Sequence, residues 1–147
     1  MRTASPLFRA LALVAIAALP AVAQTAAPAR EAIGNSSPTL TQVIKVGNLV
    51  FASGALPGRD ADSTIQSQTT SALNAIKRSF EAAGTTIENA VKCTVFLVDG
   101  ADFRGMNESY AKMWPVAPPA RTTVVVKALV VPNAKLEIEC MGTMPAK

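Results

Sequence analysis

Apolar residues recur every three or four positions in two stretches of the chain, and each stretch predicts an amphipathic helix. The first helix is predicted to be capped by residues 62–64 and to run to about Ala83, and the second runs from Asp102 to about Trp114. The apolar stripe of the second helix consists of Phe103, Met106, Tyr110 and Met113. We interpret this stripe as part of the core and not as a ligand-binding surface.

Five shorter runs have the apolar content or the alternation that is typical of strands. They are residues 42–46, 49–54, 91–98, 121–129 and 135–141. The resulting order, β-β-α-β-α-β-β, predicts an α+β fold in which both helices cover one face of a mixed sheet. In the last run Glu137 and Glu139 fall on one face, and apolar residues fall on the other. Residues 124–126 are all valine and therefore apolar towards both faces, so we expect oligomerisation to bury them.

The first 23 residues have the pattern of a bacterial-type secretory signal peptide. Arg2 and Arg9 precede or flank an apolar run that is too short to span a bilayer, and a small-x-small motif ends at Ala23. We expect Sec-type export with cleavage near Ala23, a periplasmic or secreted location, and no stable membrane insertion afterwards. Residues 24–38 predict a flexible leader, and residues 39–147 predict a single domain.

The composition narrows the possible chemistry. The sequence contains no histidine, which excludes a Ser-His-Asp system, an imidazole base and a histidine-ligated metal. Without Arg2 and Arg9 the mature chain has 12 basic and 10 acidic residues, a net charge of +2. This balance gives no reason to expect nucleic-acid binding. Cys93 and Cys140 could form a disulfide after export or remain small buried hydrophobic residues, and both alternatives stay open.

Arg121 and Glu137 are the best candidates for chemistry. Arg121 begins a predicted strand, and a guanidinium can hold a ligand carboxylate by two parallel hydrogen bonds. Glu137 on the last strand could orient a water molecule or accept a proton. The simpler alternative is that Arg121 forms a salt bridge with a nearby glutamate or remains solvated.

Several segments together resemble the Rid (YjgF-type) family over about residues 32–144. Residues 119–121, 127–129 and 136–138 (PAR, KAL and LEI) are similar to the C-terminal signature of that family. Residues 47–54 (GNLVFASG), 91–97 (VKCTVFL) and 107–110 (NESY) resemble earlier segments in the same order.

The resemblance implies a chorismate-mutase-like fold, a homotrimer with clefts between subunits, and no cofactor. It implies hydrolysis of reactive enamine or imine acids such as 2-aminoacrylate to a 2-keto acid and ammonia. In this reading Arg121 binds the substrate carboxylate and Glu137 acts on the attacking water. The implied cleft residues are Ser53, Gly54, Asn107, Arg121 and the backbone of Thr123.

Three positions depart from the family pattern. Leu40 stands where the deaminase branch usually has a tyrosine, Ala55 where it often has glutamine, and Thr123 where it has cysteine. The main alternative is therefore a non-catalytic module that binds or senses small 2-keto or amino carboxylates. A protein-interaction role for the valine strand is a further alternative, and ribonuclease activity ranks last.

Overall fold

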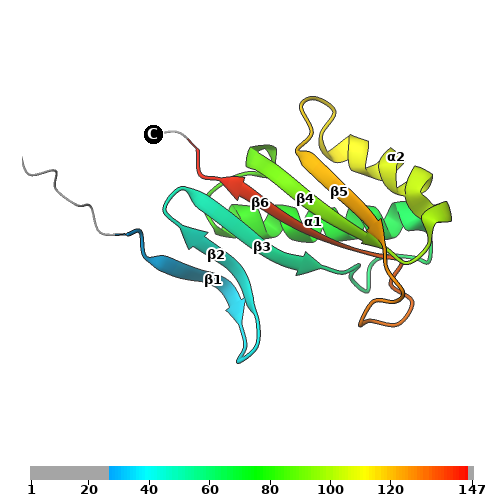
Figure 1. Ribbon diagram of the computed structural model, residues 1–147, viewed down its shortest axis with the longest axis horizontal. Helices are drawn as coiled ribbons and strands as arrows, with labels where there is room; N and C mark the ends of the chain where they lie inside the picture. The colour runs from blue at the N-terminus through cyan, green and yellow to red at the C-terminus, as the bar shows by residue number, and fades with distance from the viewer. Residues whose placement is uncertain (1–26, 146–147) are drawn as a thin grey trace, which may run out of the picture.

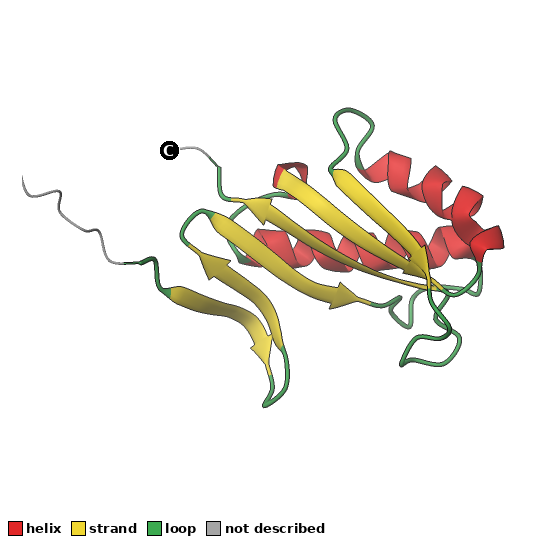
Figure 2. Cartoon of the chain, in the orientation of Figure 1, coloured by secondary structure: helices red, strands yellow, loops and turns green. Residues whose placement is uncertain are grey.

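The computed structural model describes residues 27–145, which form one six-stranded mixed sheet and two α-helices (Figures 1 and 2). The predicted signal peptide, residues 1–23, lies outside the described residues. The strands are β1 (Arg30–Ser36), β2 (Thr41–Val46), β3 (Leu49–Ala55), β4 (Ala90–Leu97), β5 (Ala120–Val125) and β6 (Leu136–Thr143). The helices are α1 (Ile65–Ala82) and α2 (Phe103–Met113), and short 3-10 turns at Ile87–Asn89 and Gly100–Asp102 precede β4 and α2.

The strand order across the sheet is β1-β2-β3-β6-β4-β5, so the last strand of the chain lies near the middle. All neighbouring strands are antiparallel except β4 and β5, which are joined by α2 and run parallel. Both helices lie on one face of the sheet, as Figure 1 shows. The α+β prediction with two helices on one face is therefore confirmed.

The segment expected to be a flexible leader, residues 24–38, differs from that prediction because residues 30–36 form β1. This strand pairs with β2 from Arg30 opposite Val46 to Ser36 opposite Thr41. Its side chains are exposed except for the half-buried Ile33, so the strand is held mainly by backbone hydrogen bonds. Because β1 has no alternation of apolar and polar residues, the sequence pattern did not predict it as a strand.

The core lies between the helices and the sheet. Helix α1 contributes Leu73, Ile76 and Phe80, all fully buried, and the sheet contributes buried residues such as Val95 and Ile138. The helix begins at the predicted place because Thr64 is its N-cap, and the Thr64 side chain accepts a hydrogen bond from the backbone N–H of Ser67. This packing fixes which face of each strand points towards the helices.

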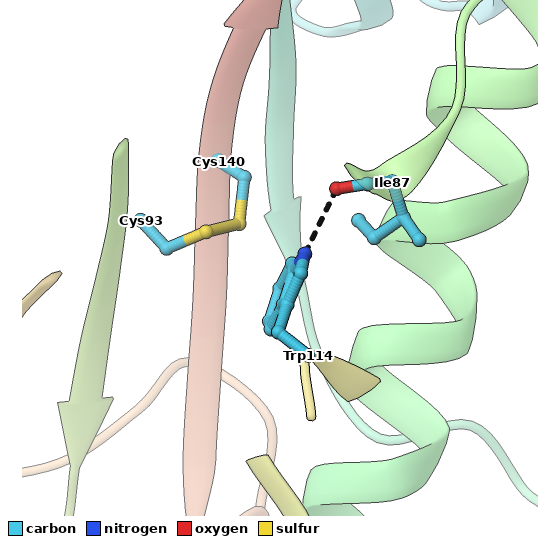
Figure 3. Close-up of a disulfide and its surroundings, with 4 residues drawn as sticks. All are labelled: Ile87, Cys93, Trp114 and Cys140. Atoms are coloured by element: carbon cyan, nitrogen blue, oxygen red, sulfur yellow. Dashed lines mark hydrogen bonds between the residues drawn. A yellow bond between two sulfur atoms is a disulfide. The ribbon is translucent and has the colours of Figure 1, made fainter. Parts of the chain in front are cut away.

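The core also contains a disulfide between Cys93 on β4 and Cys140 on β6, so the structure adopts the first of the two alternatives left open for these residues. The two cysteines are direct partners in the antiparallel register, with Cα atoms 4.1 Å apart. Both are buried on the helix side of the sheet, beside Trp114 (Figure 3). The bond therefore joins two central strands beneath the helices.

The opposite side of the sheet, which we call the open face, carries no helix among the described residues (Figure 2). Its apolar side chains include Phe51, Met141 and Val124, each between 38% and 42% exposed. The register places Phe51 next to Met141, and Phe96 next to both Glu137 and Val124. Glu137 and Glu139 therefore lie on the open face, as the alternation predicted.

Candidate functional site

Arg121 lies near the start of β5, at the edge of the sheet, and its side chain points towards α2. It is the register partner of Cys93, and partners in neighbouring strands share a face, so Arg121 lies on the helix side. Its guanidinium lies over the Tyr110 ring at 4.6 Å from the centroid and is 5.8 Å from the Phe103 centroid. One guanidinium nitrogen is 3.7 Å from the Met106 sulfur. The arginine is therefore held by two aromatic rings and a thioether.

No carboxylate neutralises this arginine within residues 27–145. The ion pairs there join Lys45 to Glu31, Arg104 to Glu108, and Lys135 to Asp102. The alternative in which Arg121 pairs with a glutamate of its own chain is therefore wrong for this structure. Because Arg121 is half-buried and without a protein anion, its positive charge remains available to a ligand anion.

Glu137 lies in the middle of the sheet, on the open face. On β6 it is three residues from Cys140, which points towards the helices, so Glu137 points the other way. Its carboxylate lies directly over Gly54 of β3, where a Cβ atom would overlap with Oε1. Glycine at position 54 therefore gives this carboxylate the space it occupies, and the two residues form one local unit.

The other predicted site residues divide between these two regions. Ser53 precedes Gly54 on β3, and its hydroxyl donates a hydrogen bond to the Thr41 carbonyl at 2.7 Å. Thr123 follows Arg121 by two residues on the same face of β5, and its hydroxyl has no hydrogen-bonding partner among the described residues. Asn107 is half-buried on α2, next in sequence to Met106. We call the group around Arg121 the arginine half-site, and the group around Glu137 the glutamate half-site.

The two half-sites do not meet within one chain. Glu137 and Val124 flank Phe96 in register on β6, β4 and β5, and Arg121 lies three residues before Val124. With strands about 4.8 Å apart and about 3.3 Å per residue, the Cα atoms of Arg121 and Glu137 are roughly 14 Å apart. Their side chains also point to opposite faces of the sheet. A small ligand that touches both groups must therefore take them from two copies of the chain.

The apolar stripe on α2 also contacts Arg121, a role that its spacing in the sequence does not indicate. Tyr110 and Met106 are buried, as the core interpretation predicted, whereas Phe103 is 45% exposed. The same stripe forms the surface on which the Arg121 guanidinium lies. Burial raises the pKa of Tyr110 to about 12, and the smaller effect of the Arg121 charge opposes this rise. The phenol is therefore neutral near neutral pH and adds no anion to the arginine half-site.

Metal binding and membrane insertion are two other possibilities for the described residues. Within residues 27–145, no group of three or more His, Cys, Asp or Glu side chains is arranged to hold a metal ion. Neither described helix is long and apolar enough to cross a membrane. Neither finding changes the two half-sites described above.

Comparison with known proteins gives a consistent match. Residues 29–144 match the family model described as Endoribonuclease L-PSP. Reactive Intermediate Deaminase A, chloroplastic, from Arabidopsis thaliana is 39% identical over 150 aligned residues, which cover 98% of this chain and 76% of that protein. The mitochondrial protein mmf2 of Schizosaccharomyces pombe is 38% identical over 106 residues, which cover 69% of this chain and 84% of that protein.

Solved structures agree with the fold. The crystal structure of TdcF from E. coli with bound serine is similar with a TM-score of 0.68 and 32% identity, covering 78% of this chain and 94% of that one. Yeast Mmf1 has a TM-score of 0.74 and 25% identity, covering 80% of this chain and all of that one. The family match spans both half-sites. The chain therefore belongs to the Endoribonuclease L-PSP family, the group that also contains the YjgF-type, RutC-type and Reactive Intermediate Deaminase proteins.

Proposed function

We propose that this protein hydrolyses reactive 2-imino and enamine acids of the 2-aminoacrylate type to 2-keto acids and ammonia. One observation carries the proposal. The half-buried Arg121 guanidinium lies over the Tyr110 ring and has no carboxylate partner among the described residues, so its charge is available to a ligand anion. The similarity to Reactive Intermediate Deaminase A supports the same type of reaction.

The chemistry needs few groups. Arg121 would bind the substrate carboxylate by two hydrogen bonds and so fix the position of the neighbouring imine carbon. An enamine first takes up a proton at carbon and loses one from nitrogen to become the imine. A water oxygen then bonds to the imine carbon while Glu137 accepts a water proton, which passes to the nitrogen. The resulting carbinolamine transfers its hydroxyl proton through Glu137 to the nitrogen as the carbon–nitrogen bond breaks, so that ammonia leaves and the carbonyl of the 2-keto acid forms.

The site requires a second copy of the chain, because the two half-sites lie on opposite faces of the sheet. The open face offers apolar surface for such a contact through Phe51, Val124 and Met141. We propose a homotrimer, which the family resemblance implies, with Arg121 of one subunit facing Glu137 of the next. We also propose that the mature protein acts in the periplasm or outside the cell, after removal of residues 1–23.

One observation favours a second candidate function. Leu40, at the position where the deaminase branch usually has a tyrosine, is 58% exposed and offers no side-chain hydrogen bond. A pocket without that hydroxyl could hold a 2-keto or amino carboxylate without turning it over. The alternative is therefore a binding or sensing module that uses the arginine half-site alone.

The test is imine hydrolysis by the mature protein, beginning at Gln24, with 2-imino acids produced in situ by an amino-acid oxidase. Arg121→Ala should lower kcat/KM by about 10- to 150-fold, as expected for the loss of hydrogen bonds to a charged group. Arg104→Ala is the matched control, because Arg104 is a highly exposed arginine of α2 whose loss should leave the rate unchanged.

Glu137→Gln separates the two candidate functions. For a deaminase, this variant should bind a 2-keto acid normally but hydrolyse imines slowly. For a binding module, the wild type should bind the 2-keto acid through Arg121 and not accelerate hydrolysis over the uncatalysed reaction. If the wild type and Arg121→Ala hydrolyse imines equally fast, Arg121 has no part in the reaction and the proposal is wrong.

A further inference from the structure

The Tyr110 ring lies directly beneath the Arg121 guanidinium. The guanidinium carbon lies 4.6 Å from the centre of the Tyr110 ring, well within the range of a cation–π interaction. A planar guanidinium that lies on a ring keeps the N–H groups along its edges free. A carboxylate approaching that edge can form two parallel hydrogen bonds. The ring therefore orients the arginine. One guanidinium N–H donates to the Met106 sulfur at 3.7 Å, and the other N–H groups have no hydrogen-bonding partner among the described residues.

Tyr110 is itself packed against a second aromatic ring. Its ring lies 4.8 Å from that of Trp114, at an interplanar angle of 40°. The indole Nε1–H of Trp114 donates a hydrogen bond to the Ile87 carbonyl at 2.9 Å (Figure 3). Tyr110 and Trp114 are each only 4% exposed. The face that Tyr110 presents to Arg121 is therefore fixed by packing and by a buried hydrogen bond.

The Tyr110 hydroxyl does not explain why a tyrosine is at this position. It is buried and has no hydrogen-bonding partner among residues 27–145. A buried polar group without a partner is unfavourable, so the hydroxyl does not stabilise this chain through a described contact. The aromatic face is the part of Tyr110 that has a defined partner, namely the Arg121 guanidinium.

We propose that Tyr110 is a positioning residue that fixes the Arg121 guanidinium for a ligand carboxylate through its aromatic face. This inference rests on the proposed function in identifying Arg121 as the carboxylate-binding group. A core residue with only a structural role would contribute volume and burial at the same position. The two roles differ because an aliphatic side chain can supply volume but no aromatic face.

The experiment compares Tyr110→Phe with Tyr110→Leu by calorimetric titration of pyruvate and by imine kinetics. Tyr110→Leu should weaken pyruvate binding and raise KM by about 3- to 30-fold, the range expected for loss of a partly desolvated cation–π contact. Its kcat should change much less, because Tyr110 does not touch the reacting carbon. Tyr110→Phe retains the ring and should stay within about twofold of the wild type.

Phe80→Leu is the control for general destabilisation. Phe80 is a fully buried aromatic residue of α1, so its replacement should lower stability without changing KM. The inference is overturned if Tyr110→Leu binds pyruvate as the wild type does, or if Tyr110→Phe loses as much affinity as Tyr110→Leu. If Tyr110→Leu does not fold, Tyr110→Phe decides alone. Weakened pyruvate binding by Tyr110→Phe would refute the role of the ring, and unchanged binding would support that role.

A failure of the proposed function can be distinguished from a failure of the Tyr110 inference. A wild type that binds pyruvate through Arg121 but hydrolyses no imine would overturn the deaminase reaction, while the pyruvate titrations of the Tyr110 variants would still decide this inference. A wild type that does not bind pyruvate, or an Arg121→Ala variant that binds it fully, would overturn the inference itself.

Discussion

Reduction of the Cys93–Cys140 disulfide should destabilise the protein strongly. The two cysteines are separated by 47 residues in sequence, and their bond closes that length of chain into a loop in the unfolded state. In the chain-entropy description the stabilisation grows with the logarithm of loop length, which gives about 4 kcal/mol for this loop at 25 °C. For a guanidinium m-value of about 4 kcal/mol/M, the midpoint of unfolding should fall by about 1 M on reduction.

The assay is guanidinium unfolding of the mature protein with and without a phosphine reductant. Trp114 is the only tryptophan and is 4% exposed, so its fluorescence should report loss of the core. Protein concentration must be held constant, because assembly would also contribute to apparent stability. The double variant Cys93→Ala/Cys140→Ala is the control, since the reductant should not change its midpoint.

Two results would refute this reasoning. A midpoint that is the same with and without reductant would mean that the cross-link does not stabilise the folded state. Uptake of a thiol-reactive label by the denatured, unreduced wild type would mean that the two thiols are free. A fall in midpoint much larger than predicted would indicate that the bond does more than restrict the unfolded chain.

Three further predictions concern single side chains. Tyr110 is the only tyrosine, so its tyrosinate absorbance should titrate near pH 12 in the folded protein and near pH 10 when denatured. Because the folded state holds the phenolic proton more tightly, stability should fall as pH rises from about 10 towards 12, and Tyr110→Phe should abolish this part of the fall. Thr64→Ala should lower the free energy of unfolding by about 1 kcal/mol through loss of the cap to the Ser67 amide, whereas Thr64→Ser should retain it, as measured by chemical denaturation. Gly54→Ala should lower imine hydrolysis by about 100-fold with little change in melting temperature, because the new Cβ displaces the flexible end of Glu137, and an unchanged rate would contradict this assignment.

The helices and the inner strands could be predicted from the sequence because their apolar residues repeat with the period of the element. The same alternation placed Glu137 correctly on the face opposite Cys140. It failed for β1, where Ile33 is the one half-buried residue and backbone pairing holds the strand. The run of apolar residues also predicted a strand up to residue 129, whereas β5 ends at Val125.

The candidate site was predictable in its residues but not in its arrangement. Valines at 124–126 are apolar towards both faces, so alternation along β5 could not show which side Arg121 occupies. That side depends on the parallel pairing of Arg121 with Cys93, a long-range contact that local pattern does not contain. For the same reason, Tyr110 was recognised as core but not as the partner of the guanidinium.

The placement of Arg121 and Glu137 on opposite faces of one sheet has a genetic consequence. Suppose that each site, which we call a junction, combines the arginine of one subunit with the glutamate of its neighbour. Arg121→Ala then removes the contribution of the first subunit to the junction, and Glu137→Gln removes that of the second. A cell that makes both defective chains would also form junctions in which the intact arginine of one meets the intact glutamate of the other. Two inactive alleles would then restore activity to each other, whereas one chain with both substitutions would rescue neither.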